Sequence, residues 1–233
     1  MLRMTSDLTR LLTEHGVEVP ALQPIGGSEV LGFPSAGEEA LAHWRRLRAV
    51  SEHTGHWPLL MDDEIAACLG DVTPDVPDVA PLGAAGMDDR QRQELLDEWP
   101  DEFEREDVSF RVPFFRDGQP APVLVALLPV RHGWQAPLAL GYGDWNEYPA
   151  PAKHSAFLRG WHERYGVELV SMTCADVELV MTRPPRTRSA ALDFAWEYCD
   201  YCADGVDVVY QVDGFVELAA NFLGADVVLA WWD

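Results

Sequence analysis

The C-terminal third of the sequence alternates between helical and strand-like hydrophobic periods, and this alternation limits the folds open to the chain. Residues 152–165 carry large apolar side chains at helical spacing, and residues 167–170 and 177–180 alternate as half-buried strands do. The remaining patterns are a helix from Thr187 or Ser189 to about Cys202, a strand at 206–210, a helix at 215–223 and a strand at 226–232. The order helix-strand-strand-helix-strand-helix-strand predicts an α+β fold, in which helices cover a mixed β-sheet.

The N-terminal half has shorter and less regular patterns. A proline-rich loop is expected at residues 71–86. Because no independent core is evident before residue 120, we expect residues 1–139 to dock, as an α/β region, on the sheet of a C-terminal domain formed by residues 140–233. The elements predicted here are helices from Thr5 or Ser6 to Gly16 and at 35–50, and strands at 17–20, 30–34, 57–61, 110–114 (an edge strand, because of Pro113) and 123–130.

Several short motifs follow one another in the C-terminal part. They are Trp145-Asn146-x-x-Pro149, Trp161 with Tyr165-Gly166, Arg183-Pro184-Pro185, Glu197-Tyr198-x-x-Tyr201-Cys202-x-Asp204 and the closing Trp231-Trp232-Asp233. A segment with these motifs, over about residues 140–233, resembles an uncharacterised bacterial family, domain of unknown function 4253. In that family another aromatic residue usually precedes the closing pair, where this chain has Ala230. The family has no established activity, so the resemblance implies a domain boundary and no catalytic residues.

The chain is strongly acidic, with 39 acidic and 17 basic residues and a formal net charge of −22. The acidity is uneven, since neither residues 49–89 nor residues 189–233 contain a lysine or arginine. Such a surface repels nucleic acid and anionic membranes and attracts basic partners. We therefore expect a basic protein as partner, with no nucleic acid and no membrane. The alternative is that the acidity serves only solubility.

Other features of the sequence indicate a cytoplasmic protein. The longest apolar run, residues 121–130, is too short to cross a bilayer and contains two prolines. Asp7 falls where the apolar core of a signal peptide would start. The four cysteines are too few and too irregularly spaced for a disulfide framework.

The pair Cys199-x-x-Cys202 suggests either a redox pair or half of a zinc site. A redox pair belongs at a helix N-terminus, whereas this pair falls at a predicted helix end among acidic residues, which would raise the thiol pKa. A zinc site needs a second pair, but Cys68 and Cys174 are isolated. We therefore favour structural thiols, and expect no metal site and no cofactor.

Four carboxylates flank the aromatic motifs: Asp144, Glu147, Glu197 and Asp204. Paired carboxylates can perform acid-base chemistry or hold a divalent cation. Glu197 lies among aromatic residues, so we expect it to be partly buried, with a shifted pKa. Arg183 or Arg186 is the expected partner, and a structural ion pair is the preferred interpretation. If the site is catalytic, its candidates are Glu197, Asp144, Glu147 and Arg183.

The sequence contains no serine nucleophile elbow, phosphate-binding glycine loop or dinucleotide fingerprint. Our first hypothesis is an acidic cytoplasmic interaction module, such as an immunity-type inhibitor or an adaptor, that binds a basic partner. The alternative is a hydrolase or divalent-cation-dependent enzyme that uses the carboxylates and Arg183. The sequence leaves the oligomeric state open. The candidate binding residues are Trp145, Asn146, Trp161, Arg183, Tyr198, Tyr201, Asp204, Trp231 and Trp232.

Overall fold

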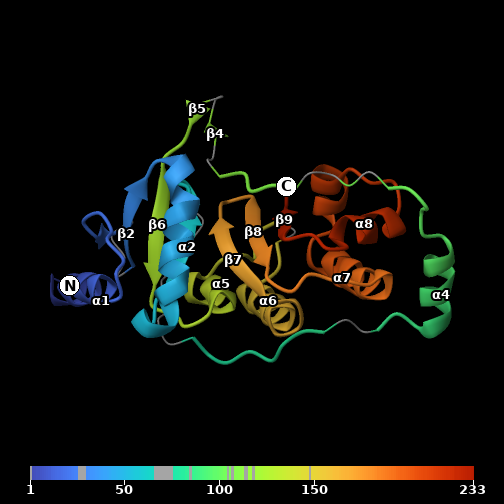
Figure 1. Cartoon of the computed structure of the whole chain (residues 1–233), viewed down its shortest axis with the longest axis horizontal. Helices are drawn as coiled ribbons and strands as arrows, with labels where there is room; N and C mark the ends of the chain where they lie inside the picture. The colour runs from blue at the N-terminus through green and yellow to red at the C-terminus, as the bar shows by residue number, and fades with distance from the viewer. Residues whose placement is uncertain are drawn as a thin grey trace. The chain divides into compact units, whose positions relative to one another are not determined.

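The chain folds into two compact units, each discontinuous in sequence (Figure 1). The first comprises Met1–Asp78, Arg111–Tyr142 and Val170–Cys174, and the second Val79–Phe110, Gly143–Leu169 and Ala175–Asp233. Neither unit therefore coincides with the segments 1–139 and 140–233. The computed structural model describes residues 2–25, 30–65, 76–83, 86–103, 105, 108–112, 115–116, 119–146 and 148–233.

Seven strands form one sheet in the order β1-β2-β6-β3-β7-β8-β9. The β3–β7 pairing is parallel, whereas the β1–β2, β2–β6, β3–β6 and β8–β9 pairings are antiparallel. This arrangement confirms the predicted α+β class and the mixed sheet. The strands are β1 (Gln23–Pro24), β2 (Leu31–Ser35), β3 (Trp57–Met61), β6 (Val123–Leu128), β7 (Val167–Met172), β8 (Asp176–Met181) and β9 (Val227–Trp231).

In the first unit, the core lies on the buried strands β3 and β6. Every residue of β3 is buried, and the indole N–H of Trp44 donates to the Pro58 carbonyl across 3.0 Å, which fastens a helix to the strand. Gly133 is required beside Trp57, because a Cβ there would lie 2.6 Å from the indole ring. The helices of this unit are α1 (Leu2–Glu14), α2 (Gly37–Thr54) and α5 (Ala136–Leu140), the last preceded by the 3-10 turn η1 (Gly133–Gln135).

Two strands predicted for the N-terminal half are wrong. Residues 17–20 form no ladder, because the Val17 N–H already bonds to the Leu12 carbonyl at the end of α1 and Pro20 has no N–H to donate. Residues 110–112 are irregular, and residues 113–114 of the predicted edge strand lie outside the described residues. A separate two-stranded ladder instead joins β4 (Phe115–Arg116) to β5 (Gln119–Pro120).

In the second unit, the helices begin and end at residues with clear local signals. The helix α6 (Pro151–Tyr165) has proline in its first turn and ends at Gly166, whose φ of 62° is left-handed. The helix α7 (Arg188–Tyr201) begins after Thr187, whose hydroxyl accepts the Ala190 N–H across 3.2 Å. The end of α6 at Gly166 and the start of α7 after Thr187 both agree with the sequence prediction. The other helices here are α4 (Asp89–Asp97) and α8 (Phe215–Phe222).

The strand predicted at residues 206–210 is wrong. These residues form a single π-helical turn, η2 (Val206–Tyr210), in which Tyr210 is buried while Asp207 and Val208 are exposed. Strand-like alternation would require Val206, Val208 and Tyr210 on one buried face. The turn instead directs the Tyr210 hydroxyl to β9, where it accepts the Leu229 N–H across 3.4 Å.

Cys174 departs from the expectation of unpaired thiols. It is disulfide-bonded, whereas Cys199 and Cys202 are free. Cys68 lies outside the described residues. Among the helices that the structure describes, none combines the length and the apolar character needed to cross a membrane.

Candidate functional site

The aromatic motifs of the second unit form its core. Trp161 on α6 is fully buried, and its ring lies 5.0 Å from both Phe194 and Tyr201 on α7. Tyr198 and Trp232 are also buried. Four of the predicted binding residues, Trp161, Tyr198, Tyr201 and Trp232, are thus buried in the packing of this unit.

Glu197 on α7 is a buried carboxylate with three donors at its two oxygens. The Trp161 indole N–H lies 2.7 Å from Oε2, and Nη2 of Arg164 lies 2.6 Å from the same oxygen. The Arg164 Nη1 donates to Oε1, so the arginine binds both oxygens. The predicted partners, Arg183 and Arg186, are therefore wrong. Arg164 was missed because no local signal links residues in two different helices.

This cluster is suited to holding charge in place and unsuited to proton transfer. Glu197 is only 2% exposed, and a buried carboxylate is stable only when it is paired and hydrogen-bonded. Burial alone would lower the pKa of Arg164, but the hydrogen bonds and the charge of Glu197 outweigh burial and raise it. Because both carboxylate oxygens already accept hydrogen bonds, Glu197 fits a structural ion pair between α6 and α7.

Arg183 lies elsewhere and stabilises a helix end. Its Nη2 donates to the carbonyls of His162 and Glu163, across 3.0 and 2.9 Å, in the last turn of α6. The His162 carbonyl also accepts the Gly166 N–H across 3.0 Å, and Arg183 adds a side-chain donor to both carbonyls at this end of the helix. Its side chain is exposed and makes no described contact with Glu197.

The loop that precedes α6 is tied to the C-terminal residues. Asn146, at a left-handed φ of 47°, donates its amide to the Asp233 carbonyl across 3.0 Å. The half-buried Trp145 packs on Tyr148, whose ring lies 5.0 Å from Trp232. The loop and the closing tryptophans of the sequence motifs thus form one structural unit.

The four carboxylate candidates do not converge on one site in the described part of the chain. Asp144 is exposed in the loop before α6, and Asp204 is half-buried after α7; neither pairs with Glu197. Glu147 lies outside the described residues. Across the described ranges, no group of three or more histidine, cysteine, aspartate or glutamate side chains could hold a metal ion.

Side chains cover the free edge of β9. The Tyr198 hydroxyl donates to the Leu229 carbonyl across 2.7 Å, while the Tyr210 hydroxyl accepts the N–H of the same residue. The Cys202 thiol donates to the Trp231 carbonyl across 3.0 Å. Buried backbone groups need such partners. The motif residues Tyr198 and Cys202 therefore close a sheet edge, and the half-buried Trp231 is the strand residue that Cys202 binds.

The thiols of Cys199 and Cys202 are held in their protonated form. Burial raises the pKa of Cys199, and burial raises the pKa of Cys202 to about 11. The sequence also predicts a raised thiol pKa, but from the neighbouring acidic residues. For Cys202 the main cause is burial, and the charge of Asp204 has a smaller effect in the same direction. Cys202 is buried and such a thiol is unreactive, whereas Cys199 is half-buried.

His154 on α6 was not singled out as a site residue by the sequence. It is fully buried, and its Nδ1 lies 2.8 Å from the Tyr201 hydroxyl. Burial, with the charge of Lys153, lowers the pKa of His154 to about 3. The imidazole ring is therefore uncharged near neutral pH. It packs in the core beside Trp232.

An open pocket of about 500 Å³ lies beside this core, and we call it the Trp196 pocket. Trp196 is 36% exposed and Leu82 is 40% exposed, and both line the pocket. The exposed Asp200 lies at the same pocket and pairs with Lys153 across 3.4 Å. Its lining residues are Leu82, Gly83, Phe157, Trp196, Glu197, Cys199, Asp200 and Phe215.

One wall of the Trp196 pocket comes from the proline-rich segment that sequence analysis treated as a loop. The Leu82 N–H donates to the Ala156 carbonyl on α6 across 3.0 Å, and Arg159 binds the Val79 carbonyl. Gly160 permits this close approach, because a Cβ there would lie 2.1 Å from the Leu82 oxygen. Apart from Gly160, no local pattern in the sequence indicates this attachment.

Residues 124–233 match the family model described as Domain of unknown function (DUF4253). The match begins earlier than the resemblance at about residue 140, so that β6, η1 and α5 lie within it. No curated protein and no solved structure matches the chain.

Proposed function

We propose that this protein is an acidic protein-interaction module, acting as an immunity-type inhibitor or an adaptor, and that it binds a basic partner at the Trp196 pocket. The observation that carries the proposal is the exposed ring of Trp196 at an apolar pocket, within a stretch of sequence that has no lysine or arginine. Partly exposed tryptophans in apolar pockets are frequent anchors of protein interfaces.

The surroundings of the pocket favour a partner segment with an apolar side chain beside lysine or arginine. Phe157 and Phe215 give the pocket apolar walls, and Asp200 provides a carboxylate at its edge. Nine acidic residues lie between 189 and 233, and opposite charge accelerates encounter with a basic partner. The same charge disfavours nucleic acid and anionic membranes.

The alternative of a hydrolase or cation-dependent enzyme receives less support. It requires Asp144, Glu147, Glu197 and Arg183 to converge, but Glu197 is held by Trp161 and Arg164 while Arg183 binds the end of α6. We therefore do not assign acid-base chemistry to this cluster.

A cytoplasmic location remains a prediction. The disulfide at Cys174 counts against it, because disulfides persist mainly in oxidising compartments. Cell fractionation, with alkylation of free thiols before lysis, tests the location and the state of Cys174 together.

The proposal is tested by capture from native lysate at low and moderate salt, with mass spectrometry of the retained proteins and binding of the purified candidate by calorimetry. We expect a basic protein that binds the wild type at low salt, binds more weakly at moderate salt, and loses at least about tenfold in affinity with Trp196→Ala, a typical interface-anchor effect. Val208→Ala is the matched control, since Val208 is exposed but does not line the pocket. Equal binding by the two variants would overturn the assignment.

A further inference from the structure

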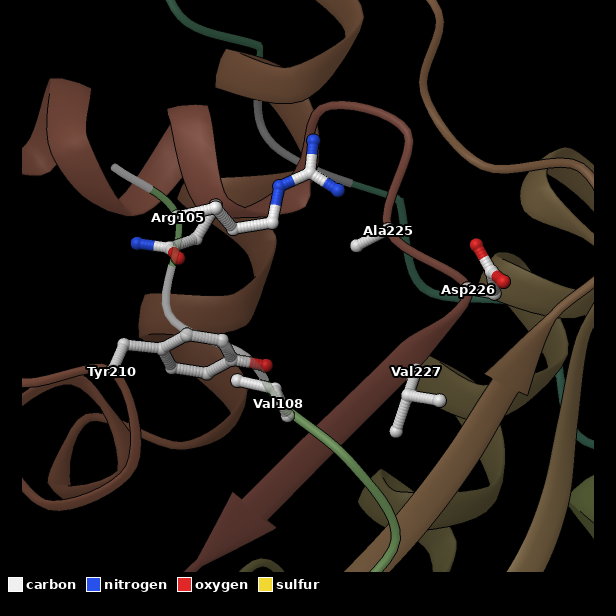
Figure 2. A pocket seen from close by; sticks show the side chains of 7 residues that line it. Arg105, Val108, Tyr210, Ala225, Asp226 and Val227 are labelled. Atoms are coloured by element: carbon white, nitrogen blue, oxygen red, sulfur yellow. The ribbon is translucent and has the colours of Figure 1, made fainter. Parts of the chain in front are cut away.

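A second pocket, of about 280 Å³, lies in the same unit between η2, the end of α8 and the start of β9 (Figure 2). It shares no lining residue with the Trp196 pocket. Its volume is at the lower end for small-molecule sites, which run from roughly 300 Å³ upward, so it suits a small ligand. We call it the Tyr210 pocket; its lining residues are Arg105, Val108, Tyr210, Asn221, Ala225, Asp226 and Val227.

The Tyr210 hydroxyl has a proton to donate into this pocket. Tyr210 is 1% exposed, and its oxygen accepts the Leu229 N–H. Within the described ranges, no residue accepts the hydroxyl proton, and Figure 2 shows the hydroxyl pointing into the pocket. Burial raises the pKa of Tyr210, so the group stays a donor. A buried donor without an acceptor is destabilising, so an acceptor from a ligand would be favourable.

The pocket also carries one positive and one negative side chain. Arg105 donates one N–H to the Leu223 carbonyl and has further donors on its guanidinium group. The backbone carbonyl of Asp226 accepts the Met181 N–H, while its carboxylate has no hydrogen-bond or ion-pair partner among the residues that the structure describes. Figure 2 shows Arg105 and Asp226 on different sides of the pocket. Their charges cancel, but they remain spatially separated.

We infer that the Tyr210 pocket binds a small zwitterion of the α-amino acid class. The ligand carboxylate accepts hydrogen bonds from Tyr210 and Arg105, and the ligand ammonium group pairs with Asp226. A simple anion would face Asp226 and a simple cation would face Arg105, so each would meet a like charge. Val108, Ala225 and Val227 provide an apolar wall for a short aliphatic side chain.

Calorimetric titration of the full chain tests this inference with L-alanine and L-valine as probes. Propionate lacks the ammonium group of alanine, and alaninamide lacks its carboxylate. We expect at least one of the two amino acids to bind at millimolar or lower concentration, and its analogues to bind at least about tenfold more weakly, equivalent to about 1.4 kcal/mol per missing interaction. The analogues are tested on the wild-type protein, so this comparison does not depend on any variant folding.

Variants assign the site. Asp226→Asn and Tyr210→Phe should each weaken amino acid binding at least about tenfold, whereas Asp213→Asn, an exposed acid outside the pocket, should leave it unchanged. The inference is overturned if neither amino acid binds, if propionate or alaninamide binds as tightly as alanine, or if Asp226→Asn binds like the wild type. None of these outcomes bears on the Trp196 pocket, since the two sites have no residue in common.

Discussion

The indole N–H of Trp161 donates a hydrogen bond of 2.7 Å to the buried carboxylate of Glu197. Arg164, on the same helix, binds both oxygens of that carboxylate, so α6 and α7 are joined through a single buried charge. Glu197 also lines the Trp196 pocket, and Arg164 donates to the Leu82 carbonyl in its wall across 3.4 Å. The ion pair therefore fixes both the core and one side of the proposed binding surface.

Removal of the arginine should destabilise the protein strongly. Arg164→Leu removes two donors from the buried Glu197 carboxylate and keeps the donor of Trp161. Breaking a buried pair costs about 3–5 kcal/mol, and because Arg164 is 37% exposed we expect a loss near 3 kcal/mol in the free energy of unfolding. Urea denaturation measures it.

The double variant separates charge from packing in this result. Arg164→Leu with Glu197→Gln removes both charges, so it should recover part of the loss, since a neutral amide is easier to bury. Arg90→Ala is the surface control, because its pair with Glu94 is exposed and should be worth less than about 1 kcal/mol. A loss from Arg164→Leu no larger than that control would contradict the structural role.

The covered edge of β9 predicts unequal effects for two tyrosines. Tyr198→Phe leaves the Leu229 carbonyl without its 2.7 Å donor, and an unsatisfied buried carbonyl costs about 1–3 kcal/mol. Tyr210→Phe removes a longer bond of 3.4 Å and should cost less. Thermal unfolding of both variants gives the comparison. A greater loss from Tyr210→Phe would mean that the hydroxyls do not close the edge as described.

The two free thiols should react slowly in the folded protein. Burial raises the pKa of Cys202 to about 11, so little thiolate exists at about pH 8, and Cys199 is shifted in the same direction. We expect labelling of Cys202 by a disulfide reagent to accelerate at least about a hundredfold when urea unfolds the chain, since the rise of its pKa from the ordinary 9.0 to about 11 alone accounts for that factor. Labelling of the native protein at the rate of a free cysteine would show that the pair is accessible.

The sequence predicts the helices and strands of the C-terminal part where the decisive signal is local. The apolar spacing and Gly166 define α6, and Thr187 defines the start of α7. The turn η2 escapes prediction because its valines and Tyr210 have the composition of a strand. Its Tyr210 hydroxyl accepts a tertiary hydrogen bond from Leu229, 19 residues away in sequence, and no local pattern contains that contact.

In the candidate site, too, the features with a local sequence signal were predicted and those that depend on tertiary contacts were not. The aromatic neighbours of Glu197 were enough to predict its burial, but its partner lies 33 residues earlier on another helix and was not predicted. The Trp196 pocket was missed for a similar reason. Leu82 lies in a proline-rich segment without periodicity, and tertiary hydrogen bonds with Ala156 and Arg164 place it against α6.

His154 predicts a specific loss of stability in acid. Its pKa is about 3 in the folded protein against the ordinary 6.5, so the folded state favours the neutral ring. The stability from this group is complete above about pH 6.5 and falls as the pH drops toward 3, because the unfolded chain takes up the proton first. The slope approaches about 1.4 kcal/mol per pH unit in that range.

Urea unfolding at about pH 7 and pH 5 should show this loss of stability in the wild type and a smaller loss in His154→Gln. The exposed His53→Gln controls for general acid effects and should behave like the wild type. If His154→Gln retains the full acid dependence, another group is responsible and the neutral His154 is not what links stability to pH.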